Sequence, residues 1–403
     1  MKVLLASPGW PPDRFANGIV TYVDAIRAGL EGLGVEVRVV TGRVEGPAKD
    51  DGLVLLSDPR SIPLIPQKRL KRLSMRALGD DFSSIDSARR MVRTIRRLEP
   101  SFQPDILEME ESFGVPRRVS QKIDVPVVVR LHGPWFLNGD ALGVPKDRAY
   151  HRRVELEGLA IKEACAITSP SEDLLNRVRR FYGFALPEAE VIPNPAPEVE
   201  NADLWKLSDC DPNLIVYVGR FDRHKGGDLV IDAFASLADE RKELRLAFIG
   251  PDRGLHVPGS GSLSLQDYVS MRVQNEAVRA RIQYLGRLSP EEVTTWRRRA
   301  RAVVVASRFE VFGMVLVEAL AQGCPVVGAD VGGISEILEH QENGLLFERS
   351  NAADLAEKMQ TLLDDENLST KLGDQGRLDM EGRFSRQVVA KQTKALYERA
   401  LAG

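Results

Sequence analysis

Two segments of the chain combine a strand end, a glycine and charged side chains in a way that suits phosphate binding. The first carries Arg220 and Lys225 in a short loop that follows the apolar run Leu214–Val218 and leads into a helix at about Gly227. A helix N-terminus offers free N–H groups and a partial positive charge, and two cations beside it make a site for a diphosphate. The segment is neither a Walker loop nor a G-x-G-x-x-G fingerprint, which disfavours an ATPase or a simple dehydrogenase. Surface charge on a tight turn is the alternative.

The second segment follows the apolar run Ala302–Ala306. Glu310 lies in the loop after this run, Gly313 allows a close backbone approach at the start of the next helix, and Glu318 lies one or two turns into that helix. Backbone amides of such a loop can meet phosphate oxygens, and the two carboxylates can accept hydrogen bonds from sugar hydroxyls. A solvent-exposed helix glutamate without a role is the alternative for Glu318.

The first half of the chain contributes two further candidates. His132 stands at the end of the apolar run Pro126–Leu131, and the carboxyl ends of parallel strands are where open α/β sheets bind ligands. A long loop, Ser7–Gly18, follows the first apolar run, and its backbone could approach a phosphate or a sugar. The alternatives are a structural histidine and a structural turn in which Trp10 packs.

Short apolar runs alternate with amphipathic stretches along the chain, which is typical of parallel strands connected by helices. Several runs are apolar almost throughout, as expected of strands buried on both faces. We therefore predict an α/β protein with two Rossmann-like, doubly wound parallel sheets. The expected strands are Lys2–Ser7, Val35–Thr41, Asp105–Met109, Pro126–Leu131, Cys165–Thr168, Leu214–Val218, Leu244–Ile249, Ile282–Leu285, Ala302–Ala306 and Pro325–Gly328. The expected helices of the first half are Gly18–Gly32, Ser87–Leu98 and Arg148–Ala164.

A proline-rich stretch, Ile192–Pro212, has little periodic apolar pattern and is interpreted as a linker between domains. We place an N-terminal domain at residues 1–195, a second domain at 196–384 and a final helix at 385–403. The stretch Arg253–Ser264 contains glycine and serine and is expected to be a mobile loop.

The composition excludes several classes of protein. The 403 residues carry a formal net charge of −3, so there is no global basic field of the kind that nucleic-acid binders use. No apolar stretch approaches the ~20 residues of a membrane span, and the N-terminal apolar run is too short for a signal peptide. Cys165, Cys210 and Cys324 lack zinc or disulfide spacing and are interpreted as reduced packing residues. We therefore expect a cytoplasmic protein.

One region, residues 68–97, is strongly basic. One interpretation is a basic face that contacts anionic lipid headgroups, as a peripheral contact with the inner face of the membrane, or an acidic acceptor. Solvated helix faces in a chain that is acidic elsewhere are the alternative. The basic residues are Lys68, Arg69, Lys71, Arg72, Arg76, Arg89, Arg90, Arg93, Arg96 and Arg97.

These motifs together resemble the retaining glycosyltransferases of the GT-B fold, family 4. The resemblance extends over nearly the whole chain and is strongest in the C-terminal half. Glu310 and Glu318 form an E-x7-E element within Ser-Arg-Phe-Glu-Val-Phe-Gly, followed by Glu-Ala-Leu-Ala-Gln-Gly-Cys-Pro-Val-Val. Further matches are Val-Gly-Arg-Phe at 218–221 with Lys225-Gly226, Val-Ile-Pro-Asn at 191–194, Gly-Gly-Ile-Ser-Glu-Ile-Leu at 332–338 and Asn-Gly-Leu-Leu-Phe at 343–347.

The resemblance implies two lobes that face a cleft, with the acceptor on the N-terminal lobe, the donor on the C-terminal lobe and the last helix crossing back to the N-terminal lobe. Arg220 and Lys225 would hold the donor diphosphate, Glu318 the ribose hydroxyls and Glu310 the hydroxyls of the donor sugar. His132 would contact the donor sugar near the reacting carbon. The residues expected to add further donor contacts are Asn17, Gly18, Phe312, Gly313, Met314 and Val315.

The activity that the resemblance implies is transfer of a sugar, with retention, from a nucleotide diphosphate sugar to a glycan, lipid-linked or small-molecule hydroxyl. A UDP-sugar is favoured over a GDP-sugar on family frequency. No Asp-x-Asp element lies in a strand-end loop, so we expect no catalytic metal and no cofactor besides the donor substrate. The alternatives are a sugar-nucleotide epimerase or phosphorylase of this fold, or a catalytically silent nucleotide-sugar-binding subunit.

Two positions depart from the family pattern. Asn17 precedes Gly18 where the family often has a glycine pair, which puts the geometry of the acceptor side in question. Pro195-Ala196-Pro197 stands where Gly-Val-Asp is usual, and we expect it to stiffen the linker.

Overall fold

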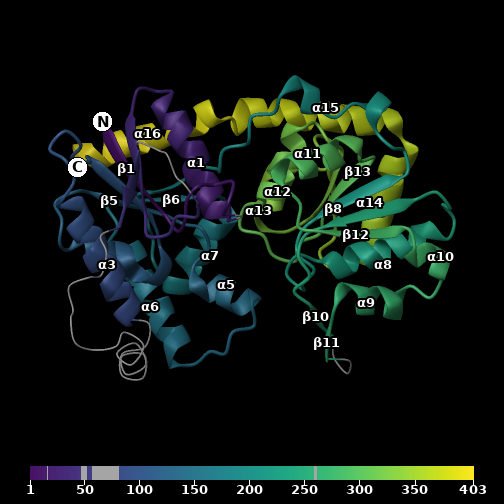
Figure 1. The fold of residues 1–403 in the computed structure, drawn as a ribbon, viewed down its shortest axis with the longest axis horizontal. Coiled ribbons are helices and arrows are strands. Elements are labelled where there is room, and N and C mark those ends of the chain that lie inside the picture. The colour runs from purple at the N-terminus through teal and green to yellow at the C-terminus, as the bar shows by residue number, and fades with distance from the viewer. Residues whose placement is uncertain (16, 47–51, 57–80, 258–260) are drawn as a thin grey trace. The chain divides into compact units, whose positions relative to one another are not determined.

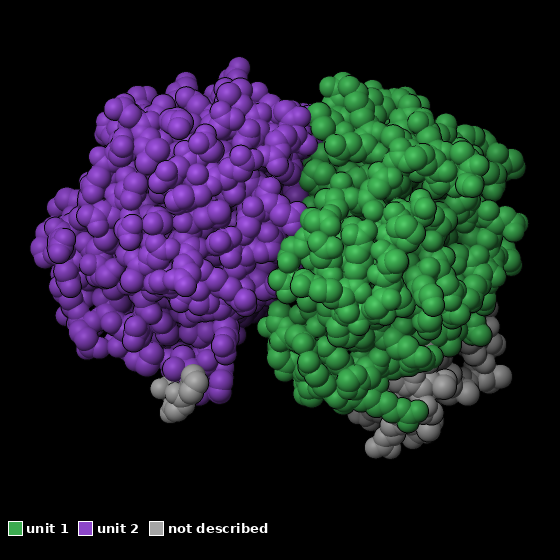
Figure 2. All heavy atoms as spheres, turned by 180° about the vertical axis from the view of Figure 1, so that it is seen from behind, with its two compact units in different colours: residues 1–195, 386–403 green, residues 196–385 purple. Residues whose placement is uncertain are grey.

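The chain forms two compact units, each built around one parallel sheet. The computed structural model describes residues 1–15, 17–46, 52–56, 81–257 and 261–403 (Figure 1). Unit 1 comprises Met1–Pro195 and Arg386–Gly403, and unit 2 comprises Ala196–Ser385 (Figure 2). Both large sheets are parallel throughout, which confirms the predicted α/β class with two doubly wound sheets. The basic residues from Lys68 to Arg76 lie outside the described residues.

Within the described residues, the unit 1 sheet has seven strands in the order β3-β2-β1-β4-β5-β6-β7. Its strands are β1 Lys2–Ser7, β2 Glu36–Thr41, β3 Leu53–Leu55, β4 Ile106–Glu110, β5 Val127–Arg130, β6 Ala166–Ser169 and β7 Ala189–Val191. Its helices are α1 Gly18–Glu31, α3 Asp81–Ile95, α4 Val115–Ser120, α5 Trp135–Ala141, α6 Arg148–Lys162, α7 Glu172–Tyr182 and α16 Arg386–Ala402. Val3 and Leu4 are both fully buried although they point to opposite faces of β1, so both faces of the sheet are covered.

Helix α16 joins unit 1 from the far end of the chain and packs along α1 (Figure 1). Val389 and Tyr397 belong to the same buried cluster as Val3 and Val20. Gly29 on α1 allows the close approach, since a Cβ at this position would lie 2.8 Å from the Ala390 Cβ. The C-terminal segment is therefore part of the core of unit 1.

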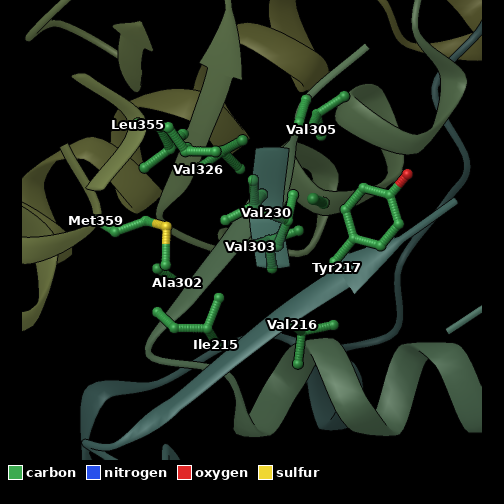
Figure 3. Packing of buried hydrophobic residues seen from close by; sticks show 14 of the residues in the cluster. Ile215, Val216, Tyr217, Val230, Ala302, Val303, Val305, Val326, Leu355 and Met359 are labelled. Carbon is green, nitrogen blue, oxygen red and sulfur yellow. The ribbon is translucent and has the colours of Figure 1, made fainter. Parts of the chain in front are cut away.

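In the part of unit 2 that the structure describes, the large sheet has six strands in the order β12-β9-β8-β13-β14-β15. Its strands are β8 Leu214–Val218, β9 Arg245–Ile249, β12 Ile282–Gly286, β13 Ala302–Val305, β14 Val326–Ala329 and β15 Leu345–Phe347. Its helices are α8 Gly227–Ala238, α9 Leu265–Arg272, α10 Glu276–Arg279, α11 Pro290–Arg299, α12 Met314–Ala321, α13 Gly332–Ile337, α14 Ala352–Asp364 and α15 Glu366–Arg383. In Figure 3, Val230 of α8 and Met359 of α14 lie among residues of the central strands, including Val303.

Three predictions are corrected. Helix α3 begins at Asp81 rather than at Ser87. The prediction missed its first turn because Ser84 is buried, and a polar residue on the buried face interrupts the apolar period. The Ser84 hydroxyl donates to the Phe113 carbonyl oxygen at 2.8 Å. The stretch Arg253–Ser264 is not simply a loop, since it contains the antiparallel strands β10 Leu255–Val257 and β11 Gly261–Leu263. Cys165 is exposed, so the packing interpretation is wrong for this residue, whereas Cys324 is buried.

Among the described residues, no helix is both long enough and apolar enough to cross a bilayer.

Candidate functional site

Two loops meet at the carboxyl edge of the unit 2 sheet, between β8 and β13. These strands are neighbours, yet the chain runs from β8 outward through β9 and β12 before it returns to β13 on the other side. The strand order therefore reverses here, which is where open α/β sheets bind their ligands. The loop after β8 carries Arg220 and Lys225, and the loop after β13 carries Glu310.

Lys225 and Glu310 form the central polar contact. The Lys225 Nζ lies 2.6 Å from the Glu310 Oε2, and the Ser307 hydroxyl donates to the same oxygen at 3.0 Å. The Lys225 and Glu310 side chains are only 23% and 15% exposed. Burial raises the pKa of Glu310, but the charge and hydrogen bond of Lys225 outweigh burial and bring the pKa below its usual 4.5. Glu310 is therefore an ionised acceptor at neutral pH.

Asp222 and Tyr217 hold the backbone of the loop after β8. Asp222 accepts the Lys225 backbone N–H at 2.8 Å and the Arg220 Nε at 2.7 Å. The Tyr217 hydroxyl lies 2.9 Å from the Lys225 carbonyl oxygen. The Arg220 side chain remains 39% exposed, which leaves part of its guanidinium accessible to a ligand.

Arg308 and His224 tie the two loops together. Arg308 donates to both carboxylate oxygens of Asp228, in the first turn of α8, at 2.8 and 2.6 Å. The His224 Nε2 lies 2.6 Å from the Phe309 carbonyl oxygen, and because a carbonyl only accepts, this nitrogen carries a proton. Burial, followed by the Lys225 charge, lowers the pKa of His224 below 6.5. The imidazole is thus a neutral donor that links the loops.

Two glycines let these loops pack backbone against backbone. Gly226 has φ 71°, and a Cβ there would lie 2.0 Å from the Ala306 carbonyl oxygen. A Cβ on Gly333, at the start of α13, would lie 2.5 Å from the Phe312 Cα. The Gly333 N–H also donates to the Glu310 carbonyl oxygen at 3.1 Å. The loop that carries Glu310 is therefore packed against backbone at Gly226 and Gly333, where a side chain would not fit.

Helices α8 and α12 begin at this edge without a side-chain cap. Their N-cap residues are Gly226 and Gly313, with φ 71° and 108°. By contrast, Ser289 caps α11 and Asn351 caps α14. First-turn N–H groups have no partner within their own helix and carry the positive end of the helix dipole. Two such ends beside Arg220 and Lys225 give a place where an anion would be stabilised.

The predicted contact residues of α12 lie at its start. Gly313 is the N-cap, and Met314 and Val315 are the first two helical residues, so their N–H groups lie in the first turn. Phe312 is only 4% exposed and packs in the core, which limits it to backbone contacts. Glu318 lies in the second turn, where its Oε2 accepts from the Arg297 guanidinium at 2.5 Å.

In unit 1, Asn17 and Gly18 stand at the start of α1. The Asn17 side chain accepts the Ile19 N–H at 2.8 Å and so caps the helix. A Cβ on Gly18 would meet no atom within 4 Å, so the space beside this residue is open. Asn17, which replaces the usual glycine, thus has a structural role of its own.

His132 follows β5 at the carboxyl edge of the unit 1 sheet. Its backbone N–H donates to the carboxyl group of Glu111, with the nearer oxygen at 3.0 Å, and its ring meets the ring of Tyr22 edge-on at 5.2 Å. Tyr22 lies one turn after Gly18, so His132 lies near the start of α1, where Asn17 and Gly18 stand. Burial, with a smaller effect of Arg130, lowers the pKa of His132 well below 6.5, and the imidazole is neutral.

The structure adds residues that sequence analysis missed. Asp222, Asp228 and Arg308 shape the loops, and Glu111 holds His132. Asp222 stands three residues before Lys225, a spacing that suits an aspartate turn and could have been noticed. The partnership of Asp228 with Arg308 joins residues 80 positions apart and leaves no local signal.

Two family models together match most of the chain. The model for glycosyl transferases group 1 matches residues 203–379, and the model for glycosyltransferase family 4 matches residues 16–197. The first match contains both charged loops of unit 2, and the second contains Gly18 and His132. The chain therefore belongs to glycosyltransferase family 4.

Similar curated proteins have related descriptions. An uncharacterized glycosyltransferase of Methanocaldococcus jannaschii is 34% identical over 193 residues, which are 47% of this chain and 49% of that protein. Glycogen synthase of Mycobacterium tuberculosis is 26% identical over 75% of this chain and 70% of its own length. D-inositol 3-phosphate glycosyltransferase of Corynebacterium efficiens is 33% identical over 46% of this chain and 43% of its own length. The chain thus spans about half the length of the first and third of these relatives.

Solved structures share the fold over the full chain. Sucrose-phosphate synthase from Thermosynechococcus elongatus has a TM-score of 0.73 at 21% identity, covering 100% of this chain and 99% of that one. Anabaena HepE in complex with UDP and glucose has a TM-score of 0.67 at 18% identity, covering 99% of this chain and 100% of that one. The chain has the GT-B fold.

Proposed function

We propose that this chain is a retaining glycosyltransferase that moves a sugar from a nucleotide diphosphate sugar to a hydroxyl of a glycan, lipid-linked or small-molecule acceptor. Unit 2 binds the donor and unit 1 the acceptor. A UDP-sugar is the favoured donor and a GDP-sugar the second choice. The observation that carries the proposal is the ion pair of Lys225 and Glu310, which joins the two loops that lead into the uncapped starts of α8 and α12, at the reversal of the strand order.

The electrostatics of this edge suit the departure of a diphosphate. Arg220, Lys225 and the starts of α8 and α12 offer fixed positive charge where negative charge grows on the leaving group. Preorganised donors of this kind are often the largest catalytic effect, and one of them contributes ~3 kcal/mol. The stabilising charge comes from the chain itself, so the proposed reaction needs no metal ion.

The other residues would orient the substrate. Glu310, ionised and held by Lys225, would accept from hydroxyls of the donor sugar, and Glu318 would accept from the ribose hydroxyls. His132, which is neutral, would contact the sugar near the reacting carbon, and Gly18 would lie by the diphosphate. The bond between the anomeric carbon and the diphosphate oxygen would break, and the acceptor oxygen would bond to that carbon on the same face, which keeps the α-configuration. The departing phosphate oxygen would take the proton of the acceptor hydroxyl, so no protein base is needed.

A thermal-shift panel of UDP- and GDP-sugars tests the proposal. We expect one nucleotide to raise the unfolding temperature of the wild type, because a ligand that binds only the folded state stabilises it. The shift should be lost in Glu310→Ala and kept in Glu366→Ala, which changes an exposed glutamate of the same unit. No shift with any nucleotide diphosphate would contradict the proposal. Binding without sugar release from the donor would instead favour a silent binding subunit.

Peripheral contact with an anionic membrane is a separate proposal. It rests on the exposed side chains of Arg89, Arg96 and Arg97, on or just after α3. Basic side chains near an anionic surface each contribute about 1 kcal/mol of attraction. Sedimentation with phosphatidylglycerol vesicles should carry the protein down at low salt. Equal recovery with neutral phosphatidylcholine vesicles would contradict the proposal.

A further inference from the structure

Glu318 does not stand alone on α12, because a buried guanidinium from α11 reaches it. The Arg297 side chain is only 4% exposed, whereas the Glu318 side chain is 32% exposed. Their contact joins a guanidinium nitrogen of Arg297 to Oε2 of Glu318 at 2.5 Å. Within the described part of the chain, Oε1 of Glu318 has no hydrogen-bond partner. The carboxylate is therefore held through Oε2, while part of the Glu318 side chain stays exposed.

Nothing else in the described residues explains a cation at this position. The Arg297 Nε is buried without a hydrogen-bond partner, and Glu318 is the acid with which Arg297 pairs. Its neighbours on α11 behave as ordinary surface residues: Arg298 donates to the Ala202 carbonyl and Arg299 is exposed beside Trp296. Burying a charged side chain often costs more free energy than its ion pair returns. An apolar side chain at position 297 would therefore serve a purely structural role better.

We propose that Arg297 is a positioning residue for the donor nucleotide, which holds Glu318 so that Oε1 accepts from the ribose hydroxyls. This inference rests on the proposed function, because it presumes that Glu318 faces a nucleotide. A free glutamate on a helix surface loses several torsional degrees of freedom on binding, and a carboxylate that is already held loses fewer. The contact with Arg297 is itself charge-assisted, and such contacts hold a side chain in a more fixed geometry than neutral hydrogen bonds do.

The test is a double-mutant cycle read out as selectivity for the ribose. The variants are Arg297→Met, Glu318→Gln and the double variant, with Arg299→Met as a matched control from the same helix. Calorimetric titration gives the affinity of each protein for UDP and for 2′,3′-dideoxy-UDP. If the donor panel selects GDP, the two ligands are GDP and 2′,3′-dideoxy-GDP. The ratio of the two affinities is insensitive to a general loss of stability, because such a loss would weaken the binding of both ligands alike.

We expect the wild type to prefer the ribonucleotide by at least about tenfold, as hydrogen bonds to a charged group allow. Arg297→Met and Glu318→Gln should each reduce this preference to a similar degree, and the double variant should reduce it no further, because the two residues act as one unit. Arg299→Met should keep the wild-type preference.

The outcomes that would decide against the inference can be told apart. Full ribose preference in a folded Arg297→Met would overturn the inference and leave the proposed function standing. Additive losses in the double variant would also overturn it. Failure of the wild type to bind either diphosphate would overturn the proposed function and the inference with it. If Arg297→Met lacks the wild-type thermal transition, Arg297→Gln replaces it, because it also removes the positive charge, and an unchanged preference in that variant would again overturn the inference.

Discussion

Among single residues, the site depends on charges that are paired before any ligand arrives. Lys225 and Glu310 were both identified from the sequence, but their contact was not, because they are 85 positions apart. The same holds for Glu318, whose partner Arg297 lies within a run of three arginines that looks uniformly solvated in the sequence. Residue types at strand ends could be predicted, whereas which charge faces which depends on the packing of separate loops.

Replacing Lys225 tests its proposed phosphate-binding role. Lys225→Met removes one charge-assisted donor, and such hydrogen bonds contribute about 1.5–3 kcal/mol, so the affinity for UDP should fall by about 10- to 150-fold. Calorimetric titration measures this loss. Lys242→Met, an exposed lysine of the same unit, should bind like the wild type. Equal affinities in Lys225→Met and the wild type would remove Lys225 from the site.

The stability of unit 1 should depend on pH through Glu111. Burial, then repulsion from Glu157, raises the pKa of the Glu111 carboxyl from 4.5 to about 8 in the folded protein. Between these pH values the folded state binds a proton more tightly than the unfolded state, so stability falls as the pH rises towards about 8. Glu111→Gln keeps an acceptor for the His132 N–H and should flatten this profile.

Urea unfolding at several pH values checks that effect. The wild type should lose stability relative to Glu111→Gln as the pH rises from about 5 to about 8. Parallel profiles for the two proteins would show that Glu111 does not titrate in this range.

Among the elements, the strands were the most predictable part of the chain. Lys2–Ser7 and Leu214–Val218 have the predicted bounds, because parallel strands buried on both faces are continuous apolar runs between turn residues. Strands β10 and β11, of three residues each, have no such run and were missed. The need for Gly333 could not be derived locally either, since its neighbour Phe312 belongs to a different loop.

Gly333→Ala tests how tightly α13 fixes the Glu310 loop. The new Cβ would lie 2.5 Å from the Phe312 Cα, so one of the two backbones must shift. A 1 Å displacement near a reacting group can cost about 100-fold in rate, and we expect a loss of this order in sugar release from the donor. Gly382→Ala is the matched control, because its Cβ would meet nothing within 4 Å. Wild-type turnover in Gly333→Ala would show that the loop tolerates the shift.

For the whole molecule, the main feature is that unit 1 contains both ends of the described chain, since α16 returns to it after unit 2. Tyr397, on the last helix, donates to the buried Glu108 Oε2 at 2.8 Å, and Tyr22 donates to Oε1 at 2.9 Å. Burial raises the pKa of Glu108 despite these donors and Arg130. The resemblance suggested a last helix on the N-terminal lobe, but this buried network, which joins residues 289 positions apart, has no local sequence signal.

Tyr397→Phe should loosen unit 1. It leaves one oxygen of a buried carboxyl group without its donor, a change that typically costs about 1–3 kcal/mol. Hydrogen exchange of β1 and β4 amides, followed by mass spectrometry, should accelerate accordingly. Leu401→Ala, at the exposed end of the same helix, should exchange like the wild type. Unchanged protection in Tyr397→Phe would mean that the hydroxyl contributes little.

The central claim is that the chain releases a nucleoside diphosphate from a sugar donor at the carboxyl ends of β8 and β13. Phosphorus NMR of the wild type and of the Arg220→Met/Lys225→Met double variant, with a panel of UDP- and GDP-sugars in EDTA, tests it most directly. We predict release from one donor by the wild type without a metal, and a loss of at least about 100-fold in the double variant. Undiminished release by the double variant, or release that stops when EDTA is added, would contradict the account.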